Sequence, residues 1–282
     1  MLQDIYPHKL NNQYDINAII EADDYVVCLD VHNNTLLNKS SFETGELVLP
    51  NYSCFNNLPK EDFIYLFTID EERFFLYNKE TLEAPGYEYI TYRQLRDKKA
   101  YPKHRIFGVF TAKHLNDWYR DNKFCGRCGK IMVHSLKERA CVCSDPECKY
   151  TSYPRIMPAV IVGVINGDKI LITRYNKGYA HNALIAGFTE IGETAEETVA
   201  REVMEEAGIK VKNIRYYKSQ PWGMPNDLLL GFYCELDGDA TIKMDSNELK
   251  YADWVAREDI VLQPDDFSLT NEMMYKFKNN EL

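Results

Sequence analysis

Three glutamates near residue 200 have a spacing that could bind a metal ion. Glu202, Glu205 and Glu206 stand at i, i+3 and i+4, so on a helix their carboxylates share one face. Three crowded carboxylates repel one another, whereas a divalent cation such as Mg²⁺ takes oxygen ligands of this kind together with substrate phosphates. The pattern therefore has two interpretations, a metal site or an acidic helix face exposed to solvent.

The flanking residues predict the helix that would present these glutamates. We expect a helix from about Thr194 to Ala207, because Thr194 and Glu197 form a capping box and Gly208 is a typical helix terminator. A glycine-containing loop, residues 187–192, precedes it. The opposite, apolar face of the helix comprises Ala195, Val199, Val203 and Ala207.

The whole stretch carries seven residues at fixed spacing, together with apolar Val203 and Ile209. The seven are Gly187, Glu193, Arg201, Glu202, Glu205, Glu206 and Gly208. This pattern resembles the Nudix box of the Nudix hydrolases, a family that cleaves nucleoside diphosphates linked to another moiety. Seven fixed positions match by chance at about 10⁻⁸ per starting residue, given roughly 7% usage per residue.

Roles for the box residues follow from their spacing and from this resemblance. The spacing makes Glu202, Glu205 and Glu206 the expected catalytic ligands of Mg²⁺ or Mn²⁺, and one of them the candidate general base. We expect Arg201 to pair with Glu193 and hold the loop against the helix, with a phosphate contact as the alternative. Two further residues of the box are expected to be structural, Gly187 and Gly208.

A group of cysteines precedes the box. Cys125 and Cys128 form a knuckle with neighbouring glycines, and Cys141, Cys143 and Cys148 follow. Four thiolates suit tetrahedral zinc, and a closed set of four is structural because it leaves no open position. The expected ligands of one zinc ion per chain are Cys125, Cys128, Cys143 and Cys148. Two alternatives stay open, namely Cys141 in place of Cys143 and free thiols without metal.

The segment after the box narrows the resemblance. Residues 219–222 read Ser-Gln-Pro-Trp, and together with the cysteine ribbon they resemble the zinc-ribbon NADH pyrophosphatase family, which includes NAD-capped RNA hydrolases. The family motif usually continues Pro-Phe-Pro-x-Ser, whereas residues 223–227 read Gly-Met-Pro-Asn-Asp. The resemblance implies a fourth metal ligand at Glu248, for which a surface glutamate is the alternative, and a homodimer. It also implies substrate contacts by Tyr153, Phe188, Gln220 and Trp222.

Hydrophobic patterning and the resemblance together predict the fold. We expect an α/β protein, a Nudix α/β/α sandwich with a mixed sheet, preceded by a Cys₄ zinc ribbon and a β-rich N-terminal domain. The predicted domains are 1–110, 111–152 and 153–282. The predicted strands are 25–29, 63–67, 73–77, 159–165, 169–173, 214–220 and 228–236; the predicted helices are 91–97, 111–122 and 267–278. Residues 97–105 read as a connection, and 249–255 as a strand or a short helix.

Composition limits the classes of function. The 282-residue chain has a net charge of −10 at pH 7, which argues against nonspecific nucleic-acid binding but not against recognition of one RNA terminus. No apolar run reaches the ~18 residues of a membrane span, and the first residues lack the pattern of a targeting signal. A cytoplasmic protein is therefore expected, in which cysteines bind metal or stay reduced.

These features predict a hydrolase that splits NAD(H) into nicotinamide mononucleotide and AMP and, by resemblance, removes NAD caps from RNA 5′ ends. ADP-ribose, FAD or another nucleoside diphosphate is the alternative substrate. A Nudix-fold sensor without turnover is a different class, and the complete set of box glutamates argues against it. A zinc-ribbon nucleic-acid binder would need a basic face, which residues 125–150 do not provide.

Overall fold

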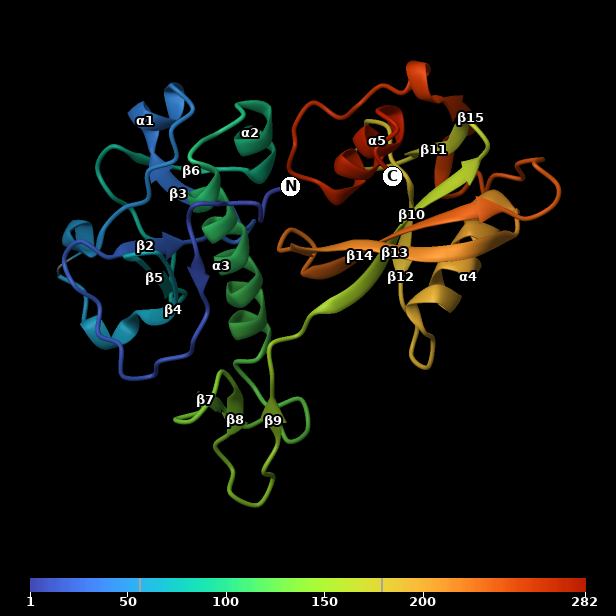
Figure 1. The fold of residues 1–282 in the computed structure, drawn as a ribbon. Coiled ribbons are helices and arrows are strands. Elements are labelled where there is room, and N and C mark those ends of the chain that lie inside the picture. The colour runs from blue at the N-terminus through green and yellow to red at the C-terminus, as the bar shows by residue number, and fades with distance from the viewer. Residues whose placement is uncertain (56, 179) are drawn as a thin grey trace. The chain divides into compact units, whose positions relative to one another are not determined.

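The computed structural model describes residues 1–55, 57–178 and 180–282, which form two compact units (Figure 1). The N-terminal unit comprises residues 2–155 and 223–225, and the C-terminal unit comprises Met1 and residues 156–222 and 226–282. The division into three domains at residues 110 and 152 stays a prediction. Among the described residues, no helix has the length and apolar character needed to cross a membrane.

The first part of the N-terminal unit, up to residue 90, contains two small sheets. Its four-stranded sheet has the order β1-β4-β5-β2, and β3 pairs with β6 in a separate ribbon. The strands are β1 (Leu10–Asn11), β2 (Tyr25–Cys28), β3 (Thr35–Asn38), β4 (Ile64–Ile69), β5 (Glu72–Tyr77) and β6 (Tyr87–Ile90). Aromatic side chains such as Phe63, Phe75 and Tyr77 fill its core. Because aromatic residues favour strands, their abundance in this region explains why its sequence predicts strands.

Three helices accompany these sheets, α1 (Lys39–Glu43), α2 (Tyr92–Asp97) and α3 (Lys103–Asp121). The predicted helix at residues 111–122 is too short at its N-terminal end, because the basic residues 97–105 read as a connection. The helix instead begins directly after Pro102, and its first turn is held by tertiary contacts. Arg105 forms an ion pair with Glu72 at 2.6 Å, and His104 lies 3.2 Å from the same carboxylate.

The cysteine segment in the same unit folds as a three-stranded sheet. Its strands are β7 (Met132–His134), β8 (Cys141–Cys143) and β9 (Thr151–Ser152), in that order. Gly129 has a φ of 74°, a left-handed conformation that suits the tight turn after the first cysteine pair. The turn and the sheet bring the two cysteine pairs toward each other.

The C-terminal unit contains a six-stranded mixed sheet. Five strands run in the order β13-β14-β10-β11-β15, and β12 pairs with β10. The strands are β10 (Met157–Asn166), β11 (Lys169–Tyr175), β12 (Ile185–Phe188), β13 (Val211–Trp222), β14 (Asp227–Leu236) and β15 (Leu249–Ala256). Only β10 and β14 pair in parallel among these strands. Residues 249–256 are thus a strand, which resolves the alternative left open by the sequence.

Helices cover both faces of this sheet. Alternate residues of β10 point to opposite sides, so that Val160 and Val162 pack with α4 (Ala195–Ala207) while Ile161 packs with α5 (Leu269–Lys278). On the α4 side Val199 and Val203 are fully buried. The predicted α/β/α sandwich is therefore confirmed, and its two helices lie on either side of the sheet in Figure 1.

Candidate metal centre

The candidate site is framed by β12, the loop after it and α4. Thr194 caps the helix through a complete capping box with Glu197, and Gly208 ends it in the left-handed conformation at φ 68°. Both predictions for the helix ends are confirmed. The capping box also lowers the pKa of Glu197, chiefly through the hydrogen bond from the Thr194 backbone N–H. The caps fix where α4 begins, and hence which side chains face β12.

Gly187 on β12 lies directly against the carboxylate of Glu202. A Cβ atom built on Gly187 would stand 1.9 Å from Cδ of Glu202 and 2.0 Å from its Oε1. Any side chain at position 187 would therefore displace this carboxylate. Glu202 is itself buried, with 9% of its surface exposed, and burial raises its pKa although the neighbouring Arg201 opposes the shift.

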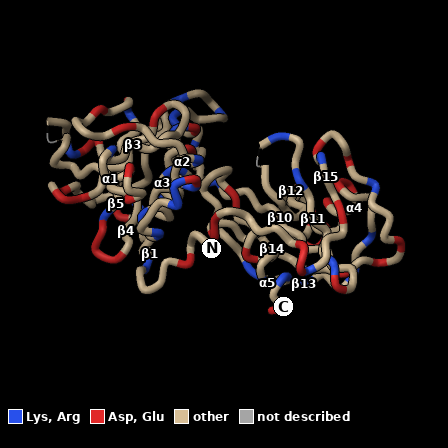
Figure 2. Tube along the Cα trace, turned by 90° about the horizontal axis from the view of Figure 1, so that it is seen from above, with Lys and Arg blue, Asp and Glu red and all other residues tan. Residues whose placement is uncertain are grey.

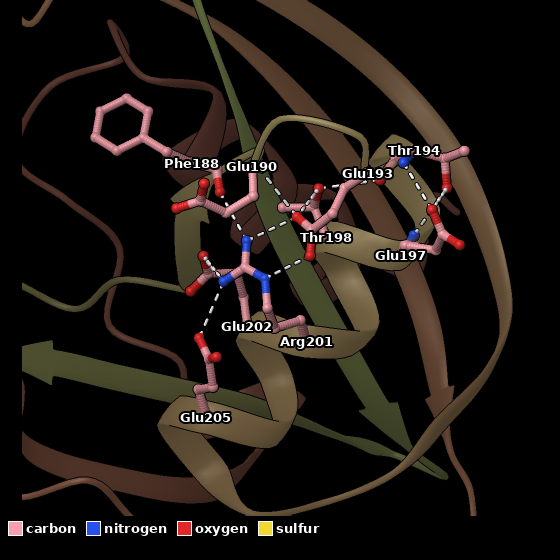
Figure 3. A network of polar contacts seen from close by, with 9 residues as sticks. All are labelled: Phe188, Glu190, Glu193, Thr194, Glu197, Thr198, Arg201, Glu202 and Glu205. Carbon is pink, nitrogen blue, oxygen red and sulfur yellow. Dashed lines mark hydrogen bonds and ion pairs between the residues drawn. The ribbon is translucent and has the colours of Figure 1, made fainter.

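Arg201 connects the loop to the helix (Figure 3). Its guanidinium donates two hydrogen bonds to Glu193, at 2.7 and 2.9 Å, and one to the backbone carbonyl of Phe188 at 2.8 Å. The same group reaches Glu202 at 2.7 Å and Glu205 at 3.0 Å. The hydrogen bonds from Arg201 lower the pKa of Glu193 to about 2, so this carboxylate stays ionised.

Glu206 is the most buried carboxylate of the helix, with 2% of its surface exposed. Neither of its two carboxylate oxygens has a hydrogen-bond partner among the described residues. Burial, followed by repulsion from Glu202 and Glu248, raises the pKa of Glu206 to about 8. A buried acid of this kind is stable only when it is neutral or when a cation balances its charge, so these oxygens could hold a divalent metal ion.

Glu248 belongs to the same group of carboxylates. It lies on the loop before β15, and its charge contributes to the raised pKa of both Glu202 and Glu206. Tyr175, which the sequence did not single out, lies beside this group. Its hydroxyl donates to the Leu184 carbonyl at 3.4 Å, and burial, followed by the charge of Glu206, raises its pKa.

Glu205 differs from the other two glutamates on its face. Its side chain is 59% exposed, and its contact is the ion pair with Arg201. Acidic residues mark the course of α4 in Figure 2. The exposed side chain places Glu205 on the solvent side of this helix. The three glutamates therefore occupy one helix face but two environments, two buried carboxylates beside β12 and one exposed.

The expected substrate-contacting residues are found in different surroundings. Phe188 is 51% exposed, and its ring points away from the Arg201 network in Figure 3. Trp222, at the end of β13, packs against the core beneath α5. Tyr153 belongs to the N-terminal unit, where its hydroxyl donates to Glu138 at 3.1 Å. The aromatic residues thus belong to two separately described units.

Gln220 has a role that its motif did not predict. The side chain is fully buried, its amide donates to the Phe267 carbonyl at 2.7 Å, and its carbonyl accepts from the Leu269 backbone N–H at 2.6 Å. These bonds satisfy backbone groups at the start of α5. The Gln220 amide is thus enclosed in the core and joins β13 to α5, and a substrate contact at this residue stays a prediction.

The cysteine cluster is formed by four of the five cysteines in its segment. Each of the four sulfur atoms lies within 4.8 Å of the others, with Cys125 and Cys148 at 3.7 Å and Cys128 and Cys143 at 3.4 Å. Cys141 is buried on β8 outside the cluster, and burial raises the pKa of its thiol to about 11. The geometry therefore selects Cys143 over Cys141 as the fourth sulfur of a tetrahedral site.

Two family models match the segments of the chain that contain the candidate sites. The model of the Nudix domain matches residues 155–277, and that of the NADH pyrophosphatase zinc ribbon domain matches residues 120–153. The crystal structure of a Nudix hydrolase from Nitrosomonas europaea has 21% sequence identity and a TM-score of 0.48, covering 56% of this chain and 91% of that one.

Curated relatives match the same region. The "NAD-capped RNA hydrolase NudC" of Pectobacterium carotovorum is 45% identical over 141 residues, which is 50% of this chain and 53% of that protein. The protein of the same name from Mannheimia succiniciproducens is 38% identical over 170 residues, 58% of this chain and 63% of that protein. The match thus spans about half the length of the first relative. We conclude that the chain contains a Nudix domain at residues 155–277, preceded by an NADH pyrophosphatase zinc ribbon domain at residues 120–153.

Proposed function

We propose that this protein is a metal-dependent hydrolase that cleaves the pyrophosphate of NAD(H) into nicotinamide mononucleotide and AMP. The observation that carries the proposal is the group of carboxylates formed by Glu202, Glu206 and Glu248, in which Glu206 is buried without a hydrogen-bond partner among the described residues. The matching ribbon and the names of the relatives support NAD(H) as the substrate.

The proposed ligands of Mg²⁺ or Mn²⁺ are Glu202, Glu205, Glu206 and Glu248. The two oxygens of Glu206, which are buried without a hydrogen-bond partner among the described residues, are donors that suit a hard divalent cation. A bound ion would act as a Lewis acid that offsets the negative charge of the diphosphate and makes a bound water more acidic. The chain itself keeps these oxygens in place, because Gly187 leaves room for Glu202 and Arg201 ties α4 to the loop.

Zinc at the four-cysteine cluster is proposed as a structural ion, one per chain. The cluster offers four sulfurs and no oxygen or nitrogen ligand, so a tetrahedral ion there would have no open position for a substrate. Its role would be to hold β7, β8 and β9 together, since sheets this small have little core of their own.

Recognition of the flat nicotinamide or adenine base is assigned to aromatic side chains. We propose Tyr153, Phe188 and Trp222, of which the first two are more than half exposed and available for stacking. In the family that the sequence resembles, such residues come from two subunits, so a homodimer is part of the proposal. Light scattering on the purified protein would test it, with a monomer as the contradicting result.

Removal of NAD caps from RNA 5′ ends is proposed as a second use of the same reaction. The relatives are named for it, and the chemistry at the diphosphate would be identical. A capped RNA differs from NAD only in the nucleotide chain attached to its adenosine. Digestion of an NAD-capped transcript to a 5′-monophosphate RNA, with an uncapped triphosphate transcript as control, tests this activity.

The decisive experiment compares substrates. The protein is incubated with NADH, NAD⁺, ADP-ribose and FAD, in the presence of Mg²⁺ or Mn²⁺, and the products are identified by mass spectrometry. We expect nicotinamide mononucleotide and AMP as the main products. Preferred cleavage of ADP-ribose or FAD would keep the enzyme but exclude the NAD(H) assignment. Binding without turnover of any of the four would leave a nucleotide sensor instead.

A further inference from the structure

The loop that carries Glu248 has no regular secondary structure of its own, and other elements hold it in place. On one side it is bonded to the end of α4. The backbone N–H of Asp245 donates to the Glu206 carbonyl at 3.0 Å, and that of Lys243 donates to the Ala207 carbonyl at 2.8 Å. The loop and the helix that bears Glu206 are therefore directly connected.

On the other side the loop is held by Asn176, the residue that follows β11. Its side-chain amide donates to the carbonyls of Ser246 at 2.8 Å and Asn247 at 3.1 Å. Its backbone N–H donates to the carbonyl of Glu248 at 2.8 Å. One residue thus binds three consecutive carbonyls, the last of which belongs to the proposed metal ligand.

The loop is also shaped from within. A carboxylate oxygen of Asp245 accepts hydrogen bonds from the backbone N–H of Asn247 at 2.8 Å and from its side-chain amide at 2.9 Å. This turn directs the carbonyls of residues 246 and 247 to one side, where the side-chain amide of Asn176 donates hydrogen bonds to both. Position 176 must therefore supply two donors, which an asparagine amide does and an aspartate does not.

We propose that Asn176 is a positioning residue that holds Glu248 in reach of Glu202 and Glu206, so that the carboxylates act as one metal site. Glu248 is exposed and lies on a loop, so little packing holds its side chain. The position of its carboxylate therefore depends on how firmly the loop backbone is held. Residues behind metal ligands commonly change metal affinity or activity by 10–100-fold. This inference rests on the proposed function for its catalytic consequence, but its structural part concerns metal binding alone.

The test measures Mn²⁺ binding to the full-length protein by electron paramagnetic resonance, without substrate, and then NADH turnover. We expect Asn176→Ala to weaken Mn²⁺ binding about tenfold. The Mn²⁺ concentration needed for half-maximal turnover should rise by the same factor. Asn176→Asp should be at least as impaired despite its equal size, because a carboxylate would face two carbonyls. Thermal unfolding should stay near wild type for both, since the side chain is exposed.

Asn279→Ala is the matched control, because this exposed amide also donates to a backbone carbonyl, that of Tyr275 at 2.9 Å, at the end of α5. Its Mn²⁺ affinity should equal that of wild type. Glu248→Gln completes a double-mutant cycle, in which adding Asn176→Ala should cause less than a twofold further loss of affinity.

A full tenfold further loss in that background would overturn the inference, and so would wild-type Mn²⁺ affinity in both Asn176 variants. The two proposals fail separately. If the wild-type protein cleaves none of the dinucleotides, the proposed function is lost, whereas the Mn²⁺ measurements still decide the role of Asn176.

Discussion

At the scale of single residues, the three glutamates of the box differ in where their carboxylates lie. Glu202 and Glu206 are buried and Glu205 is exposed, although all three share one helix face. Burial without a partner is costly for a charged group, and a protein keeps such a group where a cation or a proton compensates it. The environment thus separates residues that their spacing makes equivalent.

Glu206→Gln tests the central ligand. Replacing this proposed ligand by a neutral amide should lower turnover of NADH by more than roughly 100-fold. Mutation of a residue that only hydrogen-bonds to a metal ligand already lowers metal affinity or activity by about 10–100-fold. The melting temperature without divalent metal should stay near wild type or rise, since a neutral amide replaces a buried acid whose pKa is about 8. Initial rates and thermal unfolding check both points. Full activity in this variant would refute the assignment.

The pH dependence of stability gives a second test of Glu206. Its folded-state pKa of about 8 lies above the ordinary value of 4.5, so the folded protein holds a proton that the unfolded chain releases between these limits. Stability contributed by this proton is complete below pH 4.5 and is lost as the pH rises through about 8. Denaturant unfolding of protein dialysed free of Mg²⁺ and Mn²⁺ tests this loss. Between pH 4.5 and about 8, the free energy of unfolding of the wild type should fall by about 1 kcal/mol per pH unit relative to that of Glu206→Gln. Parallel curves for the two proteins would contradict this expectation.

Gly187→Ala tests the close approach of β12 to the helix. The added methyl group would overlap the Glu202 carboxylate, so we expect turnover to fall at least tenfold as that ligand moves. Gly163→Ala is the matched control, because its Cβ would crowd the Tyr233 ring at 2.7 Å in the core instead. Both variants should lose about 1–3 kcal/mol of stability, but only the first should lose activity per folded molecule. Equal activity in the two would show that the overlap is relieved without moving Glu202.

At the scale of elements, the site is the meeting point of one strand, one helix and two loops. The capping box and Gly208 fix the ends of α4, and Arg201 bonds to the Phe188 carbonyl at the end of β12. In the N-terminal unit the ribbon likewise combines different elements, because Cys128 lies on a turn and Cys143 on a strand. In both cases the local conformation brings together the proposed ligands, which would otherwise be spread along the chain.

Cys143→Ser tests the ribbon. We expect the wild-type protein to contain about one zinc per chain and this variant to lose it, because three sulfurs no longer close the tetrahedron. Cys141→Ser is the control and should keep its zinc, since Cys141 lies outside the cluster. Elemental analysis after dialysis gives the metal content directly. Retention of zinc by Cys143→Ser, with loss by Cys141→Ser, would reverse the ligand assignment.

At the scale of the whole molecule, charge is the property that separates capped-RNA recognition from general RNA binding. The chain carries −10 at pH 7, so it does not attract the phosphate backbone as a whole. A protein that holds 6–10 backbone phosphates loses roughly 10³–10⁵ in affinity between 50 and 200 mM salt. A site that recognises only the cap has no such dependence.

The salt dependence of kcat/KM therefore tests how an NAD-capped RNA is bound. We expect less than about a tenfold decrease between 50 and 200 mM salt for the capped RNA, and a similar small change for NADH measured alongside as the control. A steep decrease for the RNA alone would show that the RNA body is held by a basic surface, against the expectation from net charge.

Much of this protein was predictable from its sequence, because the signals act between near neighbours. The helix ends at Thr194 and Gly208 depend on residues a few positions apart. The same holds for the spacing of the glutamates in the box and of the cysteines in the ribbon. Such patterns predict an element, its exposed and buried faces, and the kind of metal that its ligands suit.

The tertiary structure decided what depends on residues distant in sequence. It selected Cys143 over Cys141, made residues 249–256 a strand, and placed the Gln220 amide in the core against α5. Asn176 and Ser246 are 70 positions apart, and no local pattern relates them. Propensity and spacing are set by the adjoining chain, whereas burial and hydrogen-bond partners are set by whichever segment packs alongside, and only the folded protein brings those segments together.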